Sequence, residues 1–208
     1  MATSPDKIPC FFTGTRENDF YFQVANNEPG IKCQTLSYEI STRSSLNWLR
    51  VKDNLILFLV GEDQLRFVED SSQQDRVNPA CKFIVQLFNE NPDTPPHPEN
   101  RGRPVTLAAV VDNQYKVVSC GDKYDVKVET MDKLPEIIND DDCCTLFYMR
   151  SACYSSDHFL FQSAAHNTHV LGFNQVPGEG DSKWKLVLRP LMSDEVDEGC
   201  LIDVAPCQ

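Results

Sequence analysis

Cysteine and histidine side chains are the first candidates for chemistry in this sequence. Three of the nine cysteines and three of the four histidines lie in one stretch of the chain, which contains Cys143, Cys144, Cys153, His158, His166 and His169. A histidine beside a cysteine can lower the pKa of the thiol and create a nucleophile. No nucleophile turn and no oxyanion-hole signature accompanies this stretch. We therefore expect structural cysteines, surface histidines and no catalytic residues, so that the protein is not an enzyme.

Metal binding is not predicted by the spacing of these residues. The nine cysteines are odd in number and include no C-x-x-C pair, so they can form neither a complete disulfide framework nor a typical zinc site. His166 and His169 lack further ligands at suitable spacing. The acidic run 140–142 lacks the spaced oxygen ligands and the glycine of a calcium loop, and is typical of a solvated turn. We expect free thiols, no metal and no cofactor.

The charge balance excludes several classes of partner. Asp and Glu number 31 against 19 Lys and Arg, which gives a net charge of −12. Such a protein repels phosphate backbones and anionic lipids, so neither nucleic-acid binding nor membrane insertion is predicted. The strongest apolar run, Leu55–Val60, is far shorter than the roughly 18 residues of a membrane span. Met1–Gly30 lacks a secretory signal pattern, so we expect synthesis in the cytoplasm.

Short runs of β-branched and aromatic residues predict an all-β protein. Tyr124–Glu129 alternates apolar and polar residues, as a strand with one buried face does. Turn residues that tolerate positive φ separate neighbouring runs, as expected of hairpins, at Gly61–Asp63, Asp112–Asn113 and Gly121–Asp122. A helical turn is predicted only within Met131–Ile138, where Pro135 limits its length. The spacing of the strands favours one barrel-like domain.

One stretch, Phe147–Ala165 followed by His166–Leu171, resembles the signature of the interleukin-1 family of cytokines. In that family an aromatic F-[FY]-x-R strand precedes an F-x-S element, and a strand with glycine, two aromatics and leucine follows. The positions that keep this pattern are Phe161, Ser163 and Leu171. The positions that depart from it, in place of the glycine and the two aromatics, are Thr168, His169 and Val170.

Further segments resemble one branch of that family, in the same order along nearly the whole chain. They are Leu49–Phe58, Leu65–Asp70, Phe83–Leu87, Pro104–Val111 and Trp184–Arg189. The resemblance implies a β-trefoil of about twelve antiparallel strands over residues 36–208, with six strands closing a barrel and six capping it. It also implies that residues 1–35 are a regulatory prosegment removed by proteolysis. The mature protein is then expected to be a secreted monomer that leaves the cell by a leaderless route.

The resemblance further implies a pro-inflammatory cytokine that bridges two immunoglobulin-like receptor chains, a binding chain and an accessory chain. The charged positions that would meet the binding chain are Arg50, Asp53, Asp70 and Arg76. Exposed charges are most often only solvated, but a charged rim speeds encounter and selects the partner. Two alternatives stay open. One is a suppressive or decoy member of the family, and the other is a trefoil lectin or inhibitor, which the absence of Q-x-W repeats and paired cysteines disfavours.

Processing is the point where the sequence departs from its resemblance. In the resembling branch a caspase cuts after an aspartate shortly before the first barrel strand, near Cys33 here. No aspartate lies between Phe20 and Lys52. Asp19 is therefore the candidate for a caspase-like protease, and cleavage by another protease within the polar stretch Asn26–Gln34 is the alternative.

Overall fold

The structure is a computed structural model, which describes residues 10–16, 19–24, 37–51, 55–61, 63–69, 76–90, 102–139, 144–152, 158–176, 184–192 and 197–207. The chain divides into two compact units, Met1–Gln34 and Thr35–Gln208. The role of the first unit as a prosegment stays a prediction.

The first unit contains one antiparallel hairpin, formed by β1 (Cys10–Arg16) and β2 (Asp19–Val24). The register shifts between Phe12 and Gly14, as at a β-bulge. Among the described residues, these two strands form a sheet of their own.

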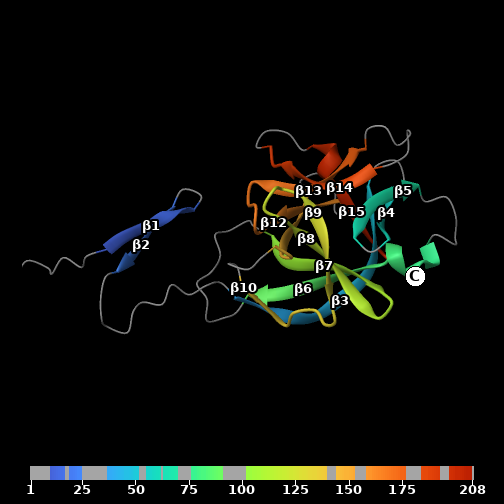
Figure 1. The fold of residues 1–208 in the computed structure, drawn as a ribbon, viewed down its shortest axis with the longest axis horizontal. Helices are drawn as coiled ribbons and strands as arrows, with labels where there is room; N and C mark the ends of the chain where they lie inside the picture. The colour runs from blue at the N-terminus through green and yellow to red at the C-terminus, as the bar shows by residue number, and fades with distance from the viewer. Residues whose placement is uncertain are drawn as a thin grey trace, which may run out of the picture. The chain divides into compact units, whose positions relative to one another are not determined.

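The second unit is built around a closed ring of six strands (Figure 1). Antiparallel pairing runs from β3 through β6, β7, β11, β12 and β15 and returns to β3. Closure leaves no free sheet edge in the ring, which is the defining property of a barrel. The ring strands are β3 (Ser37–Val51), β6 (Phe83–Glu90), β7 (Arg103–Val111), β11 (Phe147–Ser151), β12 (His158–Ser163) and β15 (Ile202–Pro206).

Three hairpins extend from the barrel. They are β4 (Leu55–Val60) with β5 (Gln64–Glu69), β8 (Gln114–Cys120) with β9 (Val126–Met131), and β13 (His169–Gln175) with β14 (Trp184–Pro190). Each hairpin is attached through a ring strand: β4 pairs with β3, β8 with β7, and β13 with β12. A six-stranded barrel capped by three hairpins is a β-trefoil, so the predicted all-β class and the six-plus-six division are confirmed.

The hairpin turns form where the sequence predicts them. Asp112 and Asn113 have φ of 52° and 62°, so both central residues of the β7–β8 turn are left-handed, as a type I′ turn requires. Gly61 has φ of 67° at the β4–β5 turn, a conformation that costs glycine little.

The helical turn predicted within Met131–Ile138 is wrong. Met131 ends β9, and a thirteenth strand of this unit, β10 (Ile137–Asn139), pairs with Ser37–Glu39 at the start of β3. Pro135 cannot donate to a helical ladder and favours an extended residue before it. Ile138 is 5% exposed in a side cluster with Tyr38, so tertiary packing favours the strand.

The main hydrophobic core lies within the barrel and below the hairpins. Its largest fully buried side chains include Phe67, Phe83, Phe147 and Phe161, each 0% exposed. These aromatic rings come from four different strands, so the core holds distant parts of the sequence together. Among the described residues, no helix has the length and apolar composition required to cross a membrane.

Candidate functional site

Trp48 and Arg50 share the outer face of β3. The residue between them, Leu49, is 0% exposed and belongs to the core, so strand alternation places its two neighbours on the opposite face. The Arg50 guanidinium carbon lies 6.0 Å from the centroid of the Trp48 ring. This distance is within the range of a cation–π contact.

Arg76 reaches the same ring from a different element. It lies in a helical turn before the 3-10 turn Pro79–Cys81, and its guanidinium carbon is 5.8 Å from the Trp48 centroid. The Asn78 side chain accepts a hydrogen bond from Ala80 N at 2.9 Å and so caps that turn. Cys81 packs with the β4 residues beside Trp48, which fixes the turn against the barrel. The indole ring of Trp48 therefore lies within cation–π distance of both Arg50 and Arg76.

The neighbouring strand β15 contributes a carboxylate that contacts a histidine. Asp203 lies opposite Arg50 in the β15–β3 register, and its carboxylate is 3.3 Å from Nε2 of His158. The Nε atom of Arg50 is buried and has no hydrogen-bond partner among the described residues. We call the group of Trp48, Arg50 and Arg76 the Trp48 surface.

The structure thus brings together two of the four predicted receptor residues, Arg50 and Arg76. The other two, Asp53 and Asp70, lie outside the described residues. Asp19, the predicted processing residue, is the first residue of β2, opposite Arg16. The sequence did not lead to Trp48 as a site residue. Strand alternation in β3 would have indicated it, because Trp48 and Arg50 are two residues apart and share one face.

A second constellation forms where the β8–β9 turn meets the β12–β13 turn. The ring of Tyr124 stacks on His169 at 4.4 Å and lies 4.6 Å from His166. The Nε2–H of His166 donates to the carbonyl of Gly121 at 2.9 Å. Tyr124 has φ of 60°, so its backbone adopts a conformation that few side-chain-bearing residues take. Burial and the neighbouring His166 lower the pKa of His169.

Acid should weaken the fold through this stack. Because the native pKa of His169 is lowered, the unfolded chain binds a proton more readily than the native chain. The free energy of unfolding is therefore expected to fall as pH drops below the ordinary value of 6.5. Urea unfolding between about pH 7.5 and pH 5.5, a range where carboxylates barely titrate, measures this slope. The His169→Gln variant should have a shallower slope, and an equal slope would contradict the assignment.

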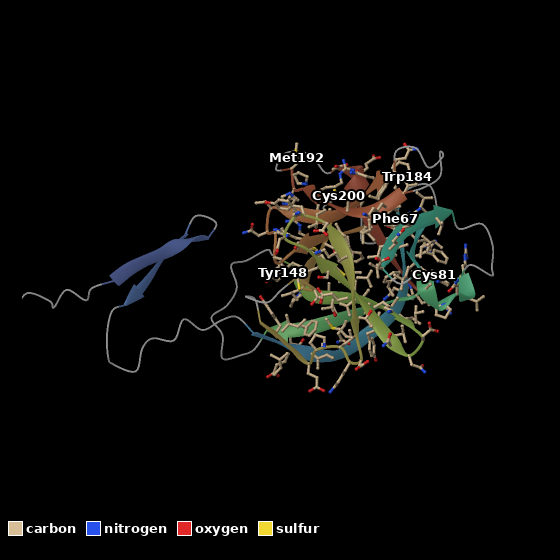
Figure 2. All side chains as sticks on the ribbon, in the orientation of Figure 1. Phe67, Cys81, Tyr148, Trp184, Met192 and Cys200 are labelled. Carbon is tan, nitrogen blue, oxygen red and sulfur yellow. The ribbon has the colours of Figure 1, made fainter. Side chains whose placement is uncertain are left out.

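The cysteine–histidine stretch does not assemble a thiol site among the described residues. Cys143 and Cys153 lie outside them, and the Cys144 thiol contacts Oε1 of Glu129 at 3.6 Å. Elsewhere, burial raises the pKa of Cys81 to about 11 and that of Cys200 to about 12. Thiols of this kind stay protonated at neutral pH and are poor nucleophiles. Figure 2 labels both cysteines, which come from separate 3-10 turns.

The three residues that match the family pattern are all in the interior. Phe161, Ser163 and Leu171 are each 0% exposed. Phe161 and Leu171 belong to the main core. The Ser163 hydroxyl accepts a hydrogen bond from His166 N at 3.1 Å and so holds the turn that leads to β13. These residues shape the fold rather than a binding surface.

Replacing Ser163 by alanine should destabilise the protein. The variant removes the acceptor for His166 N in a part-buried turn, which costs about 0.5–1.5 kcal/mol of unfolding free energy. Chemical denaturation of the wild type and the Ser163→Ala variant measures the change. The Ser151→Ala variant, at an exposed serine on β11, is the matched control and should change stability by less than about 0.5 kcal/mol.

The fold and the Trp48 surface define a β-trefoil with a cationic, aromatic face on its barrel. No protein-family model and no curated protein matches the sequence. The three-dimensional structure, in contrast, is similar to solved structures of chicken interleukin-1. The chicken cytokine interleukin 1 beta is similar with a TM-score of 0.54 and 13% identity, covering 81% of this chain and 99% of that chain. A Gallus interleukin-1 beta mutant is similar with a TM-score of 0.55 and 15% identity, again covering 81% of this chain and 99% of that chain.

A hydrophobic-cavity mutant of chicken interleukin-1 is similar with a TM-score of 0.56 at 13% identity, covering 81% of this chain and 99% of that chain. At these identities the similarity shows the fold that the chain shares with interleukin-1 beta.

Proposed function

We propose that this chain is the precursor of a pro-inflammatory cytokine of the interleukin-18 type, within the interleukin-1 family. After proteolytic removal of the prosegment, it binds one immunoglobulin-like receptor chain and recruits an accessory chain to start signalling. The trefoil shared with interleukin-1 beta supports the family, and the order of segments described in the sequence supports the interleukin-18 branch. Catalysis has no part in this proposal.

The observation that carries the proposal is the convergence of Arg50 and Arg76 on Trp48. The two arginines come from elements that are separated in sequence, and the chain as a whole has a net charge of −12. Interfaces are enriched in Trp and Arg, and guanidinium groups held over a ring lose little freedom on binding. An acidic receptor surface with apolar contacts fits this face.

The place of action follows from the same proposal. The precursor is made in the cytoplasm, and the mature protein acts outside the cell after leaderless release. Removing the first unit, Met1–Gln34, then controls access of the receptor to the second unit. A caspase-like or another protease makes the cut.

Binding measurements on two forms of the protein test this function. The full chain and a form that begins at Thr35 are passed over immobilised ectodomains of an interleukin-18-type binding chain, with an interleukin-1-type binding chain as control. We expect the shorter form to bind the first ectodomain selectively and to bind more tightly than the full chain. If neither form binds the interleukin-18-type ectodomain, the proposal is wrong. Equal affinity of the two forms would contradict only the idea that the prosegment masks the receptor-binding surface.

Recruitment of the accessory chain separates an agonist from a decoy. The accessory ectodomain is added to the complex of binding chain and shorter form. We expect a ternary complex and receptor-dependent kinase signalling in cells. A stable binary complex that never takes up the accessory chain would instead identify a suppressive member of the family.

A further inference from the structure

The three hairpins that cap the barrel line a cleft. This cleft has no part in the receptor binding proposed for the Trp48 surface. Its volume is about 490 Å³. Residues from β5, β9 and β14 line it, and these three strands contact one another in pairs. None of the residues of the Trp48 surface lines this cleft.

Each hairpin contributes one cation to the cleft. They are Arg66 from β5, Lys127 from β9 and Lys185 from β14, whereas Asp63 is the one acidic residue among the lining residues described. The cleft therefore carries a surplus of positive charge in a protein whose net charge is −12. A concave site of one sign concentrates ions of the opposite sign.

Two of these cations face each other across paired strands. Lys185 lies directly opposite Arg66 in the β14–β5 pair, where like charges destabilise a sheet. Gln64 Oε1 accepts hydrogen bonds from Nε and Nη2 of Arg66, at 3.1 and 2.9 Å, and orients the guanidinium. Lys127 is 3.5 Å from Asp125, but both side chains are largely exposed, so that pair neutralises little.

The remaining lining is apolar. Leu65 and Leu186 belong to the main core and are only 4% and 1% exposed, so they form the base of the cleft. The accessible apolar part consists of Val126, Val128 and Val176, which are half-buried. In the same strand pair, Trp184 of β14 lies opposite Phe67 of β5, and Figure 2 labels both residues. Phe173 contacts both rings, at centroid distances of 5.7 and 5.5 Å, so this support is well packed.

We propose that this cleft binds a small amphiphilic anion, in which a carboxylate, sulfate or phosphate group is attached to a compact apolar body. The acidic group meets Arg66, Lys127 and Lys185, and the apolar body contacts the half-buried side chains of Val126, Val128 and Val176. The volume is that of a small-molecule site, and an apolar lining with a few convergent polar groups is typical of such sites.

Calorimetric titration of the full chain with octanoate tests the proposal. 1-Octanol and inorganic phosphate, titrated separately, supply the apolar body and the acidic group alone. We expect octanoate to bind at least about ten-fold more tightly than either one. The affinity should fall as salt is added, because salt screens exposed charges. Equal binding of octanol and octanoate, equal binding of phosphate and octanoate, or no binding of octanoate would overturn the proposal.

Charge variants locate the site. Lys127→Gln and Lys185→Gln should each weaken octanoate binding by about three-fold, and together by about ten-fold. Lys123→Gln removes the same charge from the same hairpin as Lys127, outside the lining, and should leave the affinity unchanged. Equal octanoate affinity in the double variant and in Lys123→Gln would contradict the assignment.

Discussion

Replacing Phe161 by alanine is expected to lower the free energy of unfolding by about 3–5 kcal/mol. Phe161 is 0% exposed in the main core and lies on β12, which belongs to the barrel ring. Truncation removes the transfer free energy of the ring and leaves a cavity that a closed barrel relaxes around poorly. Because small proteins are stable by only about 5–15 kcal/mol, this one change removes a large part of the total.

Denaturant unfolding followed by tryptophan fluorescence measures this loss, since Trp48 and Trp184 both lie in the second unit. Phe161→Leu, which keeps most of the apolar volume, is the matched control and should cost clearly less than the alanine variant. A cost below about 1 kcal/mol for Phe161→Ala would mean that the core collapses around the site or that this position does not support the barrel.

The barrel could be predicted because its physical signals are local. Strand alternation and turn residues such as Asp112 and Asn113 act over a few residues, and their outcome does not depend on distant parts of the chain. The resemblance added the number and arrangement of strands. Met131–Ile138 shows the limit, because β10 forms only where β3 supplies a pairing edge and Tyr38 supplies a packing partner.

The candidate site could be predicted only in part for the same reason. Arg50 and Arg76 were predicted among four charged receptor-contact positions, but their common partner, Trp48, depends on how the turn before Pro79 folds back on β3. No pattern in the sequence predicted the cleft between the three hairpins. Arg66, Lys127 and Lys185 are far apart along the chain, and only the meeting of three hairpins places them around one volume.

The double variant Arg50→Glu with Arg76→Glu is expected to weaken binding to the receptor binding chain by at least about 100-fold. Both guanidinium groups lie within 6.0 Å of the Trp48 centroid, so both are held in place before the receptor arrives. Reversal turns attraction into repulsion at the interface, which slows association as well as speeding dissociation. Surface plasmon resonance on the form beginning at Thr35 separates the two rates, and repeating it at higher salt should reduce the difference in association rate.

The control must make the same change of charge elsewhere, since a protein of net charge −12 that becomes more acidic repels an acidic receptor from any side. Arg103→Glu with Lys123→Glu does so at two exposed positions away from Trp48, and it should keep near wild-type affinity. Trp48→Leu keeps both arginines and the net charge while removing the ring that orders them, so it should also weaken binding, mainly through faster dissociation. If the two double variants bind equally, net charge governs the encounter and the Trp48 surface does not contact the receptor. If Trp48→Leu binds like the wild type, the arginines act as independent charges and the ring contributes only to packing against Cys81.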